Sequence, residues 1–144
     1  MGRYLGVDFG TKTTGLALTD PTKTIVSPFE TILRDKAGKL RPTLRRIEEI
    51  VAEKDVELIV IGLPLNMDDS KGERALRSEE FAALLKARLE AVGANVGVIM
   101  WDERLSTAEA DEILENSLIK SHERKQYIDK IAAALILEDY MKTA

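Results

Sequence analysis

The order of its apolar segments constrains this chain more than any other feature of the sequence. Three strand-like segments come first, and strand-like and helix-like segments then alternate. Strands are expected within residues 4–8, 14–19, 24–33, 57–61 and 96–101, and helices over 39–54, 70–92, 106–116 and 127–141. Strands joined by a tight turn pair antiparallel, whereas strands joined by a helix run parallel. The order therefore predicts an α/β protein with a mixed five-stranded sheet, in which three antiparallel strands precede two parallel βα units and helices cover both faces.

Local signals add detail to this prediction. The Asp20-Pro21 turn signal ends the second strand. Pro28 cannot donate a ladder hydrogen bond, so it puts the third strand at an edge of the sheet or breaks it. Ser70 and Ser106 are each followed three residues later by Glu, which fits capping boxes at two helix starts. A doubly wound fold would alternate from its first strand, so the order favours a ribonuclease H-like fold.

Length and composition predict one globular domain over residues 1–144. With 44% hydrophobic and 32% charged residues, the chain can bury a full core without disulfides. No apolar run of 18 residues exists, and the N-terminus lacks the pattern of a secretory signal, so we expect no membrane association. The absence of cysteine and the single histidine exclude zinc–thiolate and multi-histidine metal sites. A chain without cysteine suits the cytoplasm.

The net charge is −4, but the charged residues are unevenly distributed. Residues 34–46 carry six Lys or Arg against one acid, and residues 102–115 carry six acids against one Arg. A protein that binds nucleic acid through charge alone is usually basic. An acidic chain can still bind nucleic acid if its basic residues share a face and its acids hold cations.

The segment from Leu5 to Leu18 carries the strongest chemical signal. Asp8 ends an apolar strand and meets a turn rich in Gly and Thr. A buried carboxylate is costly unless it is used, and at a strand end it can hold a hard cation. The residues of the turn can bring a phosphate close to the backbone, and they are Gly10, Thr11, Lys12 and Thr13. In the alternative interpretation, Asp8 only satisfies amides of the turn.

Two further acidic positions fit the same chemistry. Asp102 and Glu103 follow a buried strand, and because strand side chains alternate, only one of them can face Asp8. Asp129 stands near the predicted start of the last apolar helix, where the helix dipole alone would also favour an acid. Three carboxylates from two strand ends and a helix start would suit a pair of Mg²⁺ ions that catalyse phosphodiester hydrolysis.

Basic residues are interleaved with these acids. They lie at the start of the second helix, after the acidic pair, and in a basic loop over residues 120–125. The predicted phosphate-contacting residues of these segments are Lys71, Arg74, Arg104, Lys120, Arg124 and Lys125. In the alternative interpretation they are ordinary charges of solvated loops.

These motifs together resemble the YqgF family, whose members are described as pre-16S rRNA nucleases and as similar to Holliday junction resolvases. The resemblance runs from Tyr4 to about Tyr140, over GVDFGTKTTGLA, GLPLNMDDSKGERA, DERLSTAEA and IDKIAAALIL. It implies a ribonuclease H-like fold, Mg²⁺ or Mn²⁺ as cofactor, and Asp8, Glu103 and Asp129 as catalytic and metal-binding acids. The implied activity is endonucleolytic cleavage of structured nucleic acid near the 5′ end of precursor 16S rRNA.

Three other functions stay open on the sequence. A resolvase that cuts four-way DNA would need a symmetric dimer, and the sequence favours neither monomer nor homodimer. DFGTKTTG also resembles the phosphate loop of the actin, Hsp70 and sugar-kinase superfamily, which would make the chain an ATP-binding module. Such proteins need two lobes, and 144 residues supply one. The third possibility is a non-catalytic RNA-binding assembly factor.

Overall fold

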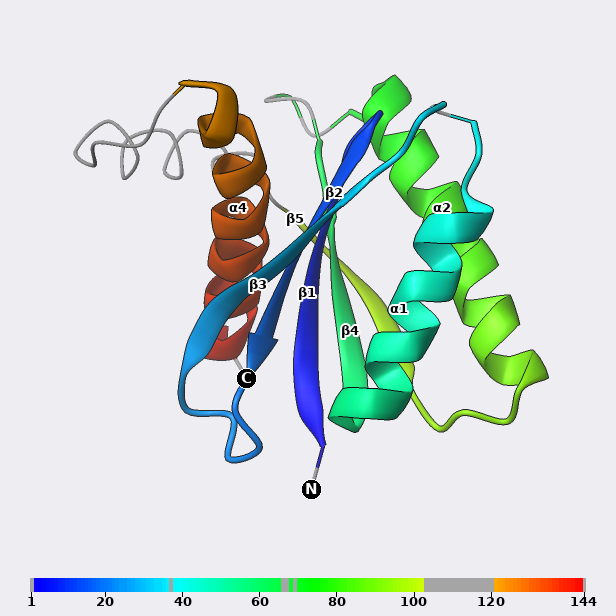
Figure 1. Ribbon diagram of the computed structural model, residues 1–144, viewed down its shortest axis with the longest axis vertical. Coiled ribbons are helices and arrows are strands. Elements are labelled where there is room, and N and C mark those ends of the chain that lie inside the picture. Colours follow the sequence, from blue (N-terminus) through cyan, green and yellow to red (C-terminus); the bar gives the residue numbers. More distant parts are fainter. Residues whose placement is uncertain (1, 37, 66–67, 69, 103–120, 144) are drawn as a thin grey trace.

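One mixed sheet organises the protein. The computed structural model describes residues 2–36, 38–65, 68, 70–102 and 121–143. Within these residues five strands form a sheet in the order β3-β2-β1-β4-β5 (Figure 1). They are β1 (Arg3–Phe9), β2 (Thr13–Thr19), β3 (Val26–Leu33), β4 (Val56–Leu63) and β5 (Gly97–Asp102). The β1–β2 and β2–β3 pairs are antiparallel and the β1–β4 and β4–β5 pairs are parallel, which confirms the predicted sheet.

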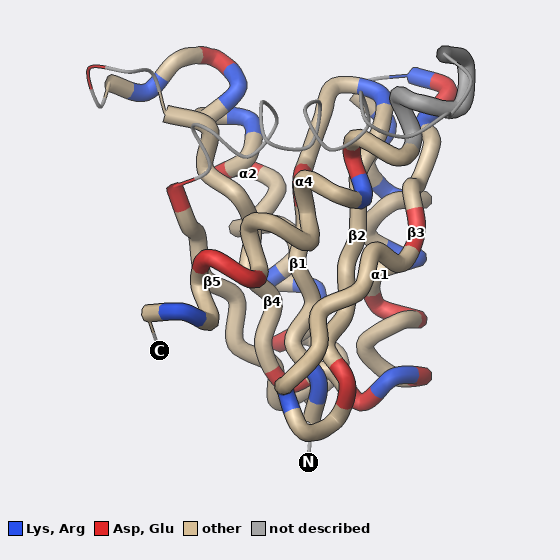
Figure 2. Tube along the Cα trace, turned by 90° about the vertical axis from the view of Figure 1, so that its left-hand side faces the viewer, with Lys and Arg blue, Asp and Glu red and all other residues tan. Residues whose placement is uncertain are grey.

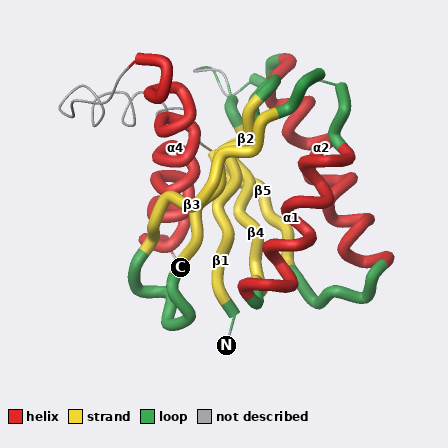
Figure 3. The backbone as a smooth tube through the Cα atoms, in the orientation of Figure 1, coloured by secondary structure: helices red, strands yellow, loops and turns green. Residues whose placement is uncertain are grey.

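Helices cover both faces of the sheet, as predicted. Those in the described part of the chain are α1 (Arg41–Lys54), α2 (Glu73–Ala91) and α4 (Ser121–Thr143). Helices α1 and α2 lie side by side on one face, and α4 packs against the other (Figures 1 and 3). No helix among the described residues is long and apolar enough to cross a bilayer.

The face under α1 and α2 is filled with large apolar side chains. Leu5, Val7 and Phe9 of β1 belong to this core, together with Ile47 of α1 and Phe81 of α2. The rings of Phe9 and Phe81 are stacked, with their centroids 4.2 Å apart. Side chains of this size keep the two helices at an ordinary distance from the sheet.

The face under α4 has small residues, which let the helix backbone come close to the sheet. Ala17 of β2 packs against Ala133 of α4. A Cβ on Gly6 would lie 2.6 Å from the carbonyl oxygen of Ala133, and a Cβ on Gly15 would lie 2.0 Å from that of Asp129. Both distances are too short for real atoms, so α4 can lie here only because these two strand positions are glycines.

The prediction that Pro28 lies in an edge strand or breaks its strand is confirmed. Its strand, β3, is the edge of the sheet, and the β2–β3 register shifts between Leu16, which pairs with Glu30, and Ala17, which pairs with Pro28. A residue without an N–H is tolerated at such an irregular position of an edge strand because it interrupts no continuous ladder.

The capping box predicted at Ser70 is wrong. Helix α2 begins at Glu73, its N-cap is Gly72, and no side chain caps it. The Ser70 hydroxyl instead lies 2.6 Å from a carboxylate oxygen of Asp68, with which it forms a local hydrogen bond. Short polar side chains often bond within their own loop in this way, and here that bond competes with the cap.

The predicted start of the last helix is also wrong. Helix α4 begins at Ser121, six residues before Tyr127, so residues 121–125 of the predicted basic loop are helical. These residues include neither Gly nor Pro, so nothing in them prevents the helix from extending toward its N-terminus. The helix predicted over residues 106–116 lies outside the described residues.

We predict that Gly15→Ala destabilises the protein. The new Cβ would lie 2.0 Å from the Asp129 carbonyl oxygen, a main-chain atom that can move only with α4. We expect a loss of roughly 1–3 kcal/mol in the free energy of unfolding, measured by urea denaturation. The matched control is Gly38→Ala, because nothing lies within 4 Å of a Cβ at that position. Equal stability of the two variants would contradict the described packing of α4 on β2.

Candidate active site

Asp8 lies near the end of β1 on the α4 face of the sheet. Leu5, Val7 and Phe9 face the opposite core, so strand alternation directs Asp8 toward α4. Only 6% of its surface is exposed. Its directly opposite neighbour in β2 is Gly15. Asp8 is therefore a nearly buried carboxylate close to the carboxyl ends of the parallel strands.

Asp129 approaches the same place from α4. Its Cβ would lie 2.9 Å from a Cβ built on Gly15, the cross-strand neighbour of Asp8. Because side chains directly opposite each other on paired strands have Cβ atoms about 5 Å apart, the Cβ atoms of Asp8 and Asp129 lie within about 8 Å of each other. The structure thus brings together two acids that are far apart in the sequence.

Because α4 begins earlier than predicted, the reason for an acid at Asp129 has to be considered again. The sequence placed this acid near a helix start, where the helix dipole would favour it. In the structure Asp129 lies about two turns after Ser121, beyond the first turn in which that effect acts. The helix dipole therefore does not account for an acid at this position.

The two carboxylates are suitable ligands for a hard divalent cation. One oxygen of each is shielded from solvent, Oδ1 of Asp8 and Oδ2 of Asp129. Carboxylate oxygens are the ligands that Mg²⁺ and Mn²⁺ take in proteins. Within the described residues no group of three or more potential ligands is present. A third acid would have to come from another part of the chain.

The end of β5 shows which way Asp102 faces. The ring of Trp101 packs on Tyr140 of α4 at a centroid distance of 5.4 Å, and its Nε1 donates to Asp139 at 2.8 Å. Trp101 therefore faces α4. By alternation Asp102, which is exposed, points toward the other face and away from Asp8.

The turn between β1 and β2 is closed by its own backbone. The Gly10 N–H donates to the Thr13 carbonyl at 2.8 Å, and a Cβ on Gly10 would lie 2.7 Å from that oxygen. The turn itself therefore requires this glycine, and its amide is already used. Thr11 and Lys12 are exposed at the tip of the turn, where their side chains can reach a phosphate.

Arg34, which follows β3, supports this turn from the α1 and α2 face. Its guanidinium donates to Thr14 Oγ1 at 2.9 Å and to the carbonyl oxygens of Gly10 and Thr11. It also lies over the Phe9 ring, 4.6 Å from the centroid. Burial lowers the pKa of the Arg34 guanidinium, although an arginine stays protonated at neutral pH. The sequence signalled this residue only as the first of a basic stretch.

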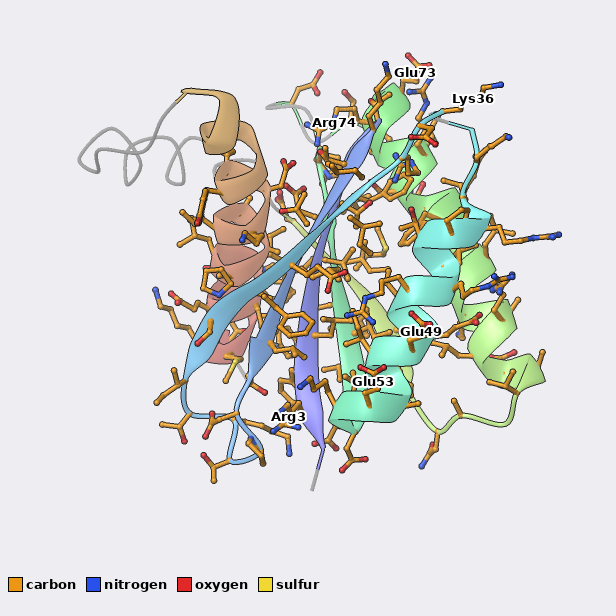
Figure 4. The ribbon with its side chains drawn as sticks, viewed as in Figure 1. Arg3, Lys36, Glu49, Glu53, Glu73 and Arg74 are labelled. Carbon is orange, nitrogen blue, oxygen red and sulfur yellow. The ribbon has the colours of Figure 1, made fainter. Side chains whose placement is uncertain are left out.

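A pocket of about 300 Å³ opens beside Arg34. Its lining includes Gly10 and Thr11 of the turn and Arg74 and Arg77 of α2. Figure 4 shows Arg74 at the end of the molecule where α2 begins, the end at which Glu73 and Lys36 also lie. The pocket therefore brings together three residues predicted to contact phosphate, which are Arg74, Gly10 and Thr11. Arg77 was not among the predicted phosphate contacts.

The other predicted basic contacts are more scattered. Lys71 forms an exposed ion pair with Glu79, with 2.8 Å between Nζ and Oε2. Arg124 and Lys125 belong to α4 and not to a loop. The predicted site residues Glu103, Arg104 and Lys120 lie outside the described residues. Lys and Arg positions are mixed with Asp and Glu positions along the described chain (Figure 2).

The strand order and the helices on both faces define a ribonuclease H-like α/β protein. The chain is similar to Thermus thermophilus RuvC in complex with a Holliday junction substrate, with a TM-score of 0.56 at 15% identity over 100% of this chain and 97% of that one. It is also similar to the fowlpox virus Holliday junction resolvase, with a TM-score of 0.57 at 14% identity over 99% of each chain. At these identities the likeness establishes the fold.

Sequence comparison identifies the family. The RuvX family model, described as Holliday junction resolvase, matches residues 2–143, and the chain belongs to this family. A protein of Lachnospira eligens named "Putative pre-16S rRNA nuclease" is 50% identical over 98% of this chain and 97% of its own length. A protein of Listeria monocytogenes with the same name is 39% identical over 98% of each. The resemblance to the YqgF family and the expected nuclease class are therefore confirmed.

We predict that Asp8→Asn stabilises the metal-free protein. The substitution removes a nearly buried negative charge close to a second carboxylate, which costs free energy while no cation is present. We expect a gain of about 1 kcal/mol, or roughly 3 °C in Tm, in thermal unfolding with EDTA.

The control for this prediction is Asp35→Asn, which neutralises an exposed carboxylate and should leave Tm nearly unchanged. Addition of Mn²⁺ should raise the Tm of the wild type more than that of Asp8→Asn. A lower Tm for Asp8→Asn in EDTA would instead support the interpretation that Asp8 only satisfies the turn.

Proposed function

We propose that the protein is a metal-dependent endonuclease that processes the 5′ end of precursor 16S rRNA, acting as one domain in the cytoplasm. The observation that carries the proposal is the contact of Asp129 with Gly15, the cross-strand neighbour of Asp8. This contact supports the interpretation that the two carboxylates, at the same end of the sheet, form one cation site. The names of the relatives in Lachnospira eligens and Listeria monocytogenes support the substrate.

In this mechanism Asp8 and Asp129 hold one or two cations. When bound, Mg²⁺ or Mn²⁺ supplies an activated water nucleophile and stabilises charge on the cleaved phosphate. The burial of Asp8 keeps its carboxylate rigid, and the attachment of α4 to the sheet fixes Asp129 relative to it. Rigid ligands of this kind would hold the cation in place without reorganisation during the reaction.

We propose Glu103 as the third ligand. It follows Asp102, whose side chain points to the opposite face from Asp8. Strand β5, which ends at the preceding residue, is separated from β1 by β4, or by about 10 Å, so the longer side chain of a Glu would suit the distance.

The phosphates of the bound strand would contact basic side chains, hydroxyl groups and the backbone of the β1–β2 turn. Thr11 and Lys12 are exposed on the β1–β2 turn, three and four residues after Asp8. The full proposed set is Gly10, Thr11, Lys12, Thr13, Lys71, Arg74, Arg104, Lys120, Arg124 and Lys125.

The second candidate is a resolvase that cuts four-way DNA. Two observations favour it: the description of the RuvX family and the fold shared with RuvC. A resolvase must cut two strands related by a two-fold axis, so this function requires a homodimer, whereas RNA processing does not. Both candidates use the same acids, and the substrate and the oligomeric state distinguish them.

We predict that cleavage of labelled precursor 16S rRNA requires Mg²⁺ or Mn²⁺ and is abolished by EDTA. Asp129→Asn and Glu103→Gln should each reduce the rate by about 100-fold or more, because ligands of one metal site act as a unit. For the same reason, their effects should not add to that of Asp8→Asn. The matched control is Asp102→Asn, which removes a neighbouring charge on the other face and should cleave at nearly the wild-type rate.

A four-way DNA junction is the competing substrate in the same assay. Preferential cutting of the junction by a dimeric protein would favour the resolvase. Full activity of Asp129→Asn would remove Asp129 from the site and overturn the proposed mechanism.

We also predict that binding of the RNA weakens steeply with salt. With about three phosphates neutralised, counterion release lowers the affinity roughly 10- to 100-fold between about 50 and about 200 mM salt. Fluorescence anisotropy with Asp8→Asn in EDTA measures binding without cleavage. Lys12→Ala should make the slope shallower, and affinity that does not change with salt would contradict the proposed phosphate contacts.

A further inference from the structure

The pocket beside Arg34 lies on the opposite face of the sheet from the acids. Phe9, which lines it, belongs to the core under α1 and α2, whereas Asp8 faces α4. Thr14, which bonds to Arg34, is the cross-strand partner of Phe9 and shares its face. The pocket and the acids are thus separated by the first hairpin of the sheet.

Arg34 is a buried charge without a carboxylate partner among the described residues. Only 7% of its surface is exposed. Its contacts are the Thr14 hydroxyl, two backbone carbonyls and the Phe9 ring, and its Nε is buried without an acceptor in the described chain. Buried charges in proteins are usually paired, so this guanidinium calls for an anion that the described chain does not supply.

The other charged residues of the pocket favour a negatively charged ligand. Arg74 has no ion-pair partner among the described residues, whereas Arg77 is paired with Glu73 at 2.6 Å. Glu80 contributes one negative charge to the lining. The unbalanced positive charge therefore comes from Arg34 and Arg74. The forked donors of Arg74 match the oxygens of a phosphate, whereas Arg34, whose donors are largely engaged by the turn, contributes its charge.

The backbone adds donors at the same place. Arg74 lies in the first turn of α2, and Gly72, the N-cap, offers no side chain to bond the open N–H groups there. Such a helix start attracts anions. A stacked nucleobase is a poorer match, because the Phe9 ring has Arg34 on it at 4.6 Å and Phe81 at 4.2 Å. Among the described residues, no other aromatic side chain lines the pocket.

We propose that this pocket is a second phosphate-binding site, which holds a phosphate group of the nucleic-acid strand whose scissile bond lies over Asp8. The inference rests on the proposed function for the identity of the strand. Because Asp8 and Phe9 are consecutive and face opposite sides, a strand that crosses the β1–β2 turn can reach both sites. The pocket then fixes the position of the strand relative to the acids without taking part in the reaction.

The test is binding of short phosphate ligands in EDTA, which reports on the pocket and not on cleavage. The probes are inorganic phosphate, a uridine dinucleotide and the same dinucleotide with a 5′-phosphate, titrated by calorimetry and by NMR. We expect binding of at least one probe to shift the amide signals of Gly10 and Thr11 and the Nε–H signal of Arg34. Tighter binding of the dinucleotide with a 5′-phosphate would identify a phosphate at a strand end as the occupant of the pocket. Equal binding of the two dinucleotides would identify an internal phosphate.

Arg74→Ala is the main variant, because Arg34 also supports the turn and its replacement could unfold the protein. We expect Arg74→Ala to weaken binding at least about tenfold. Lys86→Ala removes an exposed charge farther along α2 and should leave binding unchanged.

Two results would overturn the proposal. One is the absence of binding by the wild type at millimolar phosphate. The other is equal binding by Arg74→Ala and Lys86→Ala. Cleavage of precursor rRNA is measured separately with Mn²⁺, so a protein that binds phosphate in the pocket but cuts no RNA would contradict the proposed function and not the pocket.

Discussion

The candidate site depends on the close approach of α4 to two glycines of the sheet. A Cβ on Gly6 or Gly15 would collide with the backbone of α4, at 2.6 Å and 2.0 Å respectively. Without this approach the helix would lie farther from β1 and β2, as helices do on sheets with larger side chains. Asp129 would then be withdrawn from Asp8. The glycines therefore matter to the chemistry although neither has a side chain to contribute.

Strand alternation divides the functional groups between two faces. Asp8 points to α4, and the next residue, Phe9, points to the core under α1 and α2. The acids thus gather on one side of the hairpin and Arg34 with its pocket on the other. The hairpin thus lies between the guanidinium and the carboxylates that would hold a cation. Under the proposed function, this separation would give a bound strand two points of attachment across the turn.

The charge of the chain explains why binding would depend on specific pockets. The net charge is −4, and basic and acidic positions are mixed along the described chain (Figure 2). Several basic side chains are engaged in ion pairs, as in Lys71 with Glu79 and Arg77 with Glu73. A surface of this kind attracts polyanions weakly over long distances. Affinity then has to come from a few well-placed donors and from cations held by acids.

The sequence by itself determined the sheet and the helices on both faces, and it singled out Asp8 as a candidate site residue. These follow from local periodicity and from the cost of an acid in a buried strand, which act within a few residues. Only the tertiary structure decided that Asp129 meets Gly15 and that Arg34 supports the turn, because these contacts join segments far apart in the chain. It also decided where α4 begins, because the apolar periodicity that predicts the helix starts only near Tyr127, whereas the helix begins at Ser121.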